Sequence, residues 1–151
     1  MEHTDRQILT LLASDGRMSY TDLGKATGLS TSAVHQRVKR LEARGLIKGY
    51  GATIDHEQIG LPLTAFVSIT PIDPGQPDDY PKRLEEIEEI ESCWSVAGEE
   101  SYILKVRVAM PSDLEALLAR IRNVANVATR TTIVLSTSFE NRPVTTPAVR
   151  E

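Results

Sequence analysis

The segment Ser30–Arg44 carries the residue types that a phosphate-binding helix needs. It reads S-T-S-A-V-H-Q-R-V-K-R-L-E-A-R, with one acidic residue against four basic ones: Arg37, Lys39, Arg40 and Arg44. Their cationic groups are expected to meet phosphates and to release counterions from a nucleic acid. At the start of the segment, hydroxyl groups and free backbone N–H groups are a further source of phosphate contacts, from Ser30, Thr31 and Ser32.

The spacing of the apolar residues indicates which side of this helix is buried. Val34, Val38 and Leu41 recur at i, i+4 and i+7, a narrow stripe suited to a small core. The polar side chains expected opposite this stripe are placed to reach base edges in a major groove: Thr31, Ser32, His35, Gln36 and Lys39. Gln36 suits adenine, whereas His35 also fits an ordinary place on a polar surface.

Two shorter helices are expected before this segment. Thr4–Gln7 and Ser19–Asp22 have the composition of helix starts, and Ser30 is a third N-cap candidate. Residues 28–30, Gly-Leu-Ser, form a tight turn, and Gly45 is placed to end the last helix in a left-handed conformation. Three helices whose last two are joined by a short Gly turn predict a helix-turn-helix. The alternative is a purely structural helical subdomain.

Charge is divided unevenly along the 151 residues. Residues 1–50 hold eight Lys/Arg and five Asp/Glu, whereas residues 51–151 hold nine and sixteen, so the overall net charge is −4. A basic amino half joined to an acidic carboxyl half predicts two domains, of which only the first faces DNA. The single Cys93 excludes an intrachain disulfide, and no apolar run is long enough for a membrane span. A cytoplasmic protein with no membrane partner is expected.

The carboxyl half alternates between strand and helix patterns. After a short strand at 50–55, the patterns predict a strand at 61–70, a helix at 80–91, hairpin strands at 92–98 and 101–109, a helix from a capping box at 112–115, and a strand at 127–139. This β-α-β-β-α-β order predicts a ferredoxin-like fold and an α+β protein. The expected domains are 1–48 (helix-turn-helix), 49–60 (strand and linker), 61–140 (ferredoxin-like) and 141–151 (extended tail).

One face of such a sheet has no helix to cover it. An exposed apolar sheet face of this size is unfavourable, and no remaining segment is available to bury it. A second copy of the same sheet is the economical cover, so the sequence predicts a homodimer through the carboxyl domain.

With this organisation, the chain resembles the Lrp/AsnC family of leucine-responsive, or feast/famine, transcription regulators. The resemblance rests on T-D-R-Q-I-L near the start, L-S-T-S-A-V-H-Q-R-V-K-R-L-E-A-R-G-L-I, and V-A-G-E-E-S-Y-I-L-K-V in the hairpin. It implies an amino domain that binds double-stranded DNA and a carboxyl, RAM- or ACT-like domain that dimerises. It also implies assembly of dimers into octamers or other larger forms, and a small effector, commonly an amino acid, bound between dimers.

Carried over residue by residue, the resemblance implies an effector region at the hairpin turn and in the last strand: Gly98, Glu99, Glu100, Ser101, Tyr102 and Thr132. Ser101 replaces the acidic residue usual in the family, and Ala97 and Arg130 replace threonines. Glu99 or Glu100 is expected to take over the role of that acid toward an ammonium group. The alternative is a hairpin turn with solvated glutamates.

Enzyme chemistry has little support in the residues. Cys93 lacks an evident His partner, and His3, His35 and His56 show no metal-ligand spacing. No catalytic residue, metal or cofactor is therefore expected. The rival hypothesis is an amino-acid-binding regulatory subunit of a metabolic enzyme, with the helical domain as a docking module; the basic face of residues 31–44 favours DNA instead.

Overall fold

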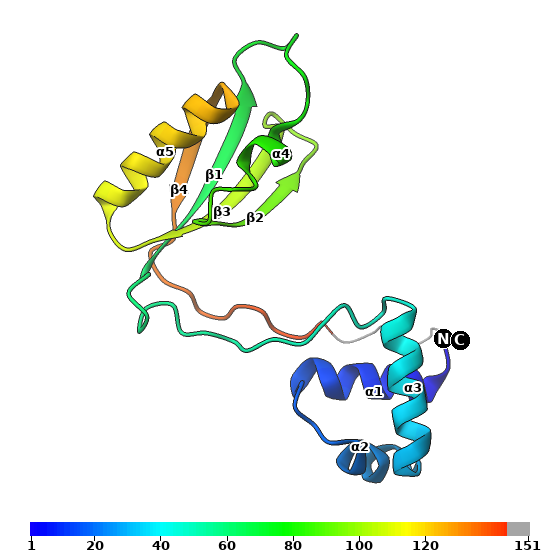
Figure 1. The fold of residues 1–151 in the computed structure, drawn as a ribbon. Coiled ribbons are helices and arrows are strands. Elements are labelled where there is room, and N and C mark those ends of the chain that lie inside the picture. The colour runs from blue at the N-terminus through cyan, green and yellow to red at the C-terminus, as the bar shows by residue number, and fades with distance from the viewer. Residues whose placement is uncertain (145–151) are drawn as a thin grey trace. The chain divides into compact units, whose positions relative to one another are not determined.

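A computed structural model describes residues 1–144 of the chain (Figure 1). The chain divides into two compact units: Met1–Thr53 together with the segment from Phe139 onward, and Ile54–Ser138. Within residues 1–144, no helix combines the length and the apolar character that crossing a membrane requires. The last part of the predicted extended tail, residues 145–151, lies outside the described residues.

The amino unit contains the three expected helices: α1 (His3–Ser14), α2 (Tyr20–Thr27) and α3 (Thr31–Ala43). Two predicted N-caps are confirmed, because the Ser19 hydroxyl accepts from Asp22 N at 3.0 Å and Ser30 accepts from Ala33 N at 3.2 Å. Gly28 and Gly45, with φ of 75° and 72°, follow α2 and α3 as predicted. The first helix is confirmed, but its predicted cap at Thr4 is wrong: α1 begins at His3 after the N-cap Glu2, which makes no side-chain hydrogen bond.

The core of the amino unit is small, and the apolar stripe of α3 supplies most of it. Its fully buried members are 0–1 % exposed: Ile8, Leu23, Val34, Val38 and Leu41. One residue from each of α1 and α2 therefore packs against three from α3, so the stripe predicted from spacing is confirmed. The same contacts fix which side of α3 remains in solvent.

Gly24 holds α2 close to the turn that leads into α3. A Cβ added to Gly24 would lie 2.6 Å from the carbonyl oxygen of Leu29, a backbone atom that cannot rotate away. Leu29 N also donates to the Gly24 carbonyl at 3.1 Å, which ties the turn to the helix. This close approach requires glycine and sets the position at which α3 begins.

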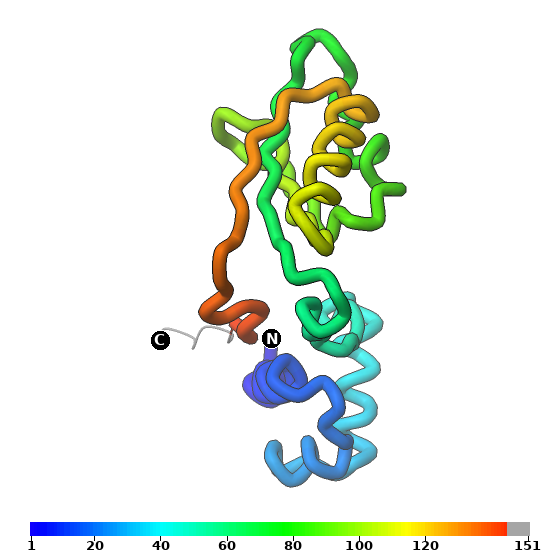
Figure 2. The backbone as a smooth tube through the Cα atoms, turned by 90° about the vertical axis from the view of Figure 1, so that its left-hand side faces the viewer, coloured from blue at the N-terminus to red at the C-terminus, as the bar shows by residue number. Residues whose placement is uncertain are grey.

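The second unit is a four-stranded antiparallel sheet covered by helices. Its strands are β1 (Leu63–Pro71), β2 (Ile90–Ser95), β3 (Tyr102–Val108) and β4 (Val127–Ile133), in the order β2-β3-β1-β4. Helices α4 (Tyr80–Leu84) and α5 (Pro111–Ala125) cover one face (Figures 1 and 2). The predicted α+β, ferredoxin-like topology is confirmed.

Alternating residues of the central strands build the core of this sheet. Ala65, Val67 and Ile69 of β1 are fully buried. The buried positions of α5 that pack in the same cluster are Leu114, Leu117, Ile121 and Ala125. The opposite face of the sheet carries Phe66, Ile103 and Trp94 beside charged side chains, and Trp94 is 46 % exposed.

The predicted helix over 80–91 is too long. Helix α4 ends at Leu84, and the chain turns at Ile87 before β2 begins at Ile90. The shortfall has an electrostatic reason, because four glutamates follow within five residues: Glu85, Glu86, Glu88 and Glu89. Like charges at i, i+3 and i+4 repel, and carboxylates are unfavourable at the negative end of a helix.

Three further expectations differ from the structure. Residues 50–55 form no strand, since no described segment pairs with them. Strand β4 ends at Ile133 rather than continuing to 139, because β1 offers no further partner beyond Leu63 and Thr64. Helix α5 begins at Pro111 and its N-cap, Met110, makes no side-chain bond, so the capping box at 112–115 is wrong; proline suits this first position because it needs no N–H partner there.

We expect Gly24→Ala to destabilise the amino unit by about 1–3 kcal/mol, because the new methyl group must displace backbone. Thermal unfolding of the full chain measures the change. Gly49→Ala is the control, since nothing lies within 4 Å of its added Cβ and its φ is not positive. Equal melting temperatures for the two variants would contradict the role of the close approach.

Candidate nucleic-acid interface and effector region

The exposed face of α3 lies opposite its buried stripe. At about 100° per residue, the positions farthest from Val34, Val38 and Leu41 are Ser32, Gln36, Lys39, Arg40 and Ala43. All five are exposed in the structure. Among the predicted base-reading residues, Ser32, Gln36 and Lys39 therefore share one outward face, which we call the reading face together with Arg40 and Ala43.

The cations of α3 differ in how freely they face solvent. Within residues 1–144, Arg40 and Arg44 form no ion pair, and both are exposed. Lys39 is also exposed, but its Nζ lies 3.3 Å from Glu42 Oε2. An exposed ion pair of this kind is weak, so Lys39 remains available to a phosphate.

Glu42, the one acidic residue of the segment, is held away from the reading face. Its Oε1 accepts a hydrogen bond of 3.0 Å from the Tyr50 hydroxyl, and this bond lowers the pKa of Glu42. Burial and the same carboxylate raise the pKa of Tyr50 to about 12. The carboxylate therefore stays ionised and occupied by Tyr50 and Lys39.

The predicted residues at the beginning of α3 are divided between capping and exposure. The Ser30 hydroxyl is occupied by the N-cap bond and lies 3.2 Å from Ser32 Oγ. Thr31 is exposed, on a flank of the helix rather than opposite the stripe. His35 is also on a flank, with its ring centroid 5.1 Å from that of Tyr20 in α2. His35 therefore packs against a neighbouring helix while remaining exposed.

Arg37 differs most from the expectation. Its Nη1 donates to Glu2 Oε2 at 2.7 Å and to Asp5 Oδ1 at 2.9 Å, so the guanidinium is paired within the domain. These two hydrogen bonds raise the pKa of Arg37. Arg37 thus joins α3 to the beginning of α1, because Asp5 is buried and requires a cationic partner. The phosphate contact expected of Arg37 stays a prediction.

The predicted effector turn connects β2 and β3. Ser101 N donates to the Ile69 carbonyl at 3.0 Å, which joins the turn to β1. Glu99 is exposed and Glu100 half-buried, and neither forms an ion pair among the described residues. The Glu100 carboxylate bends back over Gly98, where an added Cβ would lie 3.5 Å from Oε2.

Tyr102 belongs to the core rather than to an open turn. It is 9 % exposed, its ring packs against Tyr80, and its hydroxyl donates to Asp78 Oδ1 at 3.0 Å. That hydrogen bond to Asp78, followed by burial, raises the pKa of Tyr102. The side chain therefore packs in the core at the base of the turn, and the effector contact expected of Tyr102 stays a prediction.

Thr132 lies apart from the turn within one subunit. It pairs with Phe66, whereas Tyr102 at the base of the turn pairs with Ile69, three residues farther along β1. Three strand residues correspond to about 10 Å, and β1 lies between the strands β4 and β3 that carry the two positions. One chain does not bring Thr132 to Glu99 and Glu100.

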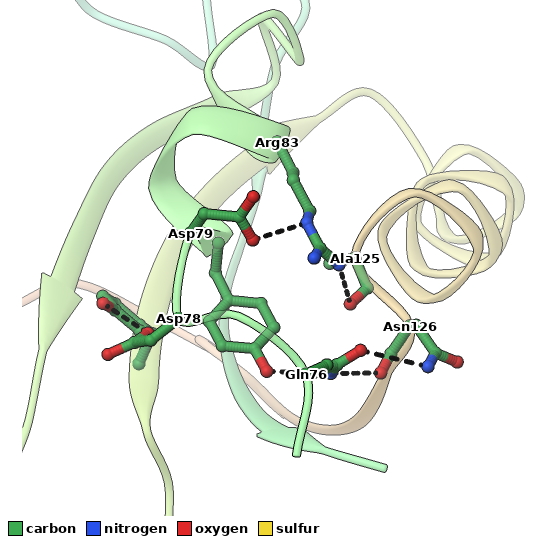
Figure 3. Close-up of polar contacts among 8 residues, drawn as sticks. Gln76, Asp78, Asp79, Arg83, Ala125 and Asn126 are labelled. Atoms are coloured by element: carbon green, nitrogen blue, oxygen red, sulfur yellow. Dashed lines mark hydrogen bonds and ion pairs between the residues drawn. The ribbon is translucent and has the colours of Figure 1, made fainter. Parts of the chain in front are cut away.

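The loop between β1 and α4 links the base of the effector turn to the end of α5, because its Asp78 accepts the hydrogen bond from Tyr102. The sequence did not predict these contacts. Gln76 Nε2 donates to the Asn126 carbonyl at 3.1 Å, and Asn126 Nδ2 donates to Gln76 Oε1 at 3.1 Å (Figure 3). Arg83 pairs with Asp79 and donates to the Ala125 carbonyl, so the loop is fixed to the end of α5 (Figure 3). Only the prolines of residues 71–77 marked this loop, and they carry no information about its partners.

A separate cleft of about 840 Å³ lies in the same unit, beside α5 and the segment after α4. Its lining includes His56, Ile87, Arg120 and Glu89, and Arg120 pairs with Glu89 at 2.6 Å. None of the predicted effector residues lines it. Among residues 1–144, no group of three or more acidic, His or Cys side chains is arranged to hold a metal ion.

Models of two domain families match the chain over these two units. The AsnC-type helix-turn-helix domain matches residues 1–42, and the Lrp/AsnC ligand-binding domain matches residues 64–144. The matched ranges contain α1–α3 and the four-stranded sheet, respectively.

Curated relatives and solved structures agree with these matches. The HTH-type transcriptional regulator LrpA of Mycobacterium tuberculosis is 56 % identical over 142 residues, which cover 94 % of this chain and 95 % of the relative. The leucine-responsive regulatory protein of Escherichia coli is 38 % identical over 121 residues, covering 78 % and 73 %. A feast or famine regulatory protein from M. tuberculosis, complexed with L-methionine, superposes with a TM-score of 0.94 at 55 % identity and covers 96 % and 99 % of the two chains.

These relatives are named as regulators of transcription, not as enzymes. Their similarity spans both units and includes the helix that the residues alone indicated as DNA-reading. The chain thus belongs to the Lrp/AsnC family of transcriptional regulators, with a helix-turn-helix DNA-binding domain and a ligand-binding domain.

Proposed function

We propose that this regulator inserts α3 into the major groove of double-stranded DNA, with the reading face toward the bases. The observation that carries the proposal is the exposed group of Ser32, Gln36, Lys39 and Arg40 opposite a fully buried stripe. Gln36 has the amide geometry for adenine, and Lys39 for phosphate or guanine. Arg40 and Arg44, which form no ion pair within residues 1–144, supply phosphate contacts, assisted by the hydroxyls of Thr31 and Ser32.

A homodimer presents two such helices. The outer sheet face, with Phe66, Ile103 and the 46 % exposed Trp94, is the proposed contact between copies. A two-fold dimer favours a roughly palindromic operator whose half-sites are about one helical turn, or a multiple of it, apart. Further assembly of dimers to an octamer, and action in the cytoplasm, belong to the same proposal.

An amino acid is the proposed effector, with no metal or cofactor. Its ammonium group requires an anion, which Glu99 or Glu100 supplies, and its carboxylate requires N–H donors such as those of the Gly98–Ser101 turn. The methionine complex of the M. tuberculosis neighbour supports this ligand class. Because Thr132 lies far from the turn of its own chain, a site that uses both takes them from different subunits, so binding is linked to assembly.

We expect Arg40→Ala and Arg44→Ala each to reduce the slope of log K against log salt by about 0.9, the effect of losing one phosphate contact. Fluorescence anisotropy with the gene's own upstream DNA at several salt concentrations measures the slope. Lys82→Ala, which removes an exposed cation from α4, is the matched control and should leave the slope unchanged. An absence of salt-dependent binding in the unaltered protein would favour the enzyme-subunit alternative.

Gln36→Ala is expected to relax sequence preference rather than to weaken all binding. Loss of a bidentate contact to adenine costs about 1–3 kcal/mol at the base that it reads and little elsewhere. Selection of bound sequences from a randomised duplex pool compares the variant with the unaltered protein. A uniform loss at every site, as expected for Arg44→Ala, would contradict base reading by Gln36.

L-Methionine is expected to raise the melting temperature of the full chain in a concentration-dependent way, because a ligand that binds only the folded state stabilises it. Replacing both turn glutamates, by Glu99→Gln with Glu100→Gln, should abolish the shift. Glu86→Gln with Glu115→Gln removes the same charge from exposed positions of the same unit and should preserve it. A shift that survives loss of the turn glutamates would place the ammonium partner elsewhere.

A further inference from the structure

Arg37 has a different environment from the other cations of α3, and we infer that it is a positioning residue for DNA binding. It fixes the orientation of α3 against α1, and the carboxylates of Glu2 and Asp5 withdraw its charge from DNA. The inference rests on the proposed reading face, and it changes which basic residues contribute to phosphate binding.

The geometry separates the two acidic partners of Arg37. The Asp5 side chain is 5 % exposed and the Arg37 side chain 23 %, so their 2.9 Å ion pair lies at the edge of the core. The Glu2 side chain is 64 % exposed and meets the same nitrogen, Nη1, at 2.7 Å from the solvent side. Asp5 is therefore the buried partner of Arg37, and Glu2 is its solvent-exposed partner.

Both ends of the inner pair are fixed by neighbouring core contacts. Asp5 precedes the buried Ile8 by three residues, so the two side chains lie on one face of α1. Arg37 lies between Val34 and Leu41 along α3, beside the buried stripe. The pair therefore bridges α1 and α3 next to their apolar contact and restricts the rotation of α3 about its axis.

Removing Arg37 leaves the Asp5 carboxylate buried without its ion-pair partner, which is unfavourable. The loss of Arg37 should lower the stability of the amino unit. It should also disturb the orientation of Gln36, which precedes Arg37 in the chain and lies on the reading face. No direct phosphate contact disappears, so the salt slope should change by much less than the roughly 0.9 of a lost contact. A phosphate-binding arginine gives the opposite result: a lower salt slope with stability retained.

The arrangement also predicts that removal of the Glu2 charge strengthens DNA binding, whereas removal of Arg37 weakens it. Together, Glu2, Asp5 and Arg37 carry a formal charge of −1 beside a helix that meets polyanionic DNA. Removing the exposed Glu2 charge should strengthen binding, by about twofold at low salt, because a single charge about 10 Å away is only partly screened. The Asp5–Arg37 pair remains in place, so stability should be nearly unchanged.

The test compares Arg37→Ala, Asp5→Asn, Glu2→Gln and Arg40→Ala in the full chain. Anisotropy against the upstream duplex at several salt concentrations gives affinity and slope, and thermal unfolding gives stability. Arg37→Ala and Asp5→Asn should lower both the melting temperature and the affinity, with a slope change well below the roughly 0.9 of a lost phosphate contact. Glu2→Gln should bind more tightly, and Arg40→Ala should bind more weakly with a reduced slope while its melting temperature is retained. Arg37→Lys, which keeps the charge but not the planar fork, should restore stability in part.

A slope reduced by about 0.9 in Arg37→Ala, with the melting temperature retained, would overturn the inference. So would weaker binding by Glu2→Gln, a surface change that remains informative if Arg37→Ala fails to fold. If Arg40→Ala also leaves the slope unchanged, the proposed reading face itself is wrong. Failure of the Arg37 inference and failure of the proposed reading face therefore give different results.

Discussion

The orientation of α3 depends on one packing constraint. Val34, Val38 and Leu41 are buried against only two fully buried partners from the other helices, Ile8 and Leu23. Partly buried side chains such as Leu9, Leu12 and Ile47 pack around this cluster, and a rotation of α3 would expose a large fraction of the apolar surface that stabilises this small unit. The short helix-turn-helix core thereby determines which polar side chains face outward.

Ion pairs and hydrogen bonds determine which of the exposed charges of α3 are free to meet DNA. The ionised Glu42 is hydrogen-bonded by Tyr50 and lies beside Lys39, and Arg37 is paired with Glu2 and Asp5. The segment Ser30–Arg44 has four basic residues against one acidic residue, and the pairing of Arg37 with Glu2 and Asp5 reduces the part of its positive charge that is free to meet DNA. Arg40 and Arg44 remain as its cations without ion-pair partners among the described residues, so binding strength is concentrated on few side chains.

Sequence patterns were sufficient where local geometry decides the structure. The i, i+4, i+7 stripe, the Ser19 and Ser30 caps and the alternation of β1 depend on neighbours along the chain, and each is confirmed. The partners of Arg37 lie 32 and 35 residues away, and Tyr102 and its acceptor Asp78 are 24 residues apart. Periodicity contains no information about such pairs. The prediction of a helix over 80–91 was wrong because the apolar spacing of this segment contains no information about the repulsion among its glutamates.

The close approach of Gly24 to Leu29 has a consequence for protein engineering. Because the turn before α3 is fixed by backbone contact, residues 32, 36 and 39 form an exchangeable group on a rigid support. A chimera that imports only these outward side chains from another regulator inherits the native helix angle. One that also replaces residues 24–30 must rebuild the joint between α2 and α3, and its groove geometry would no longer be that of this protein.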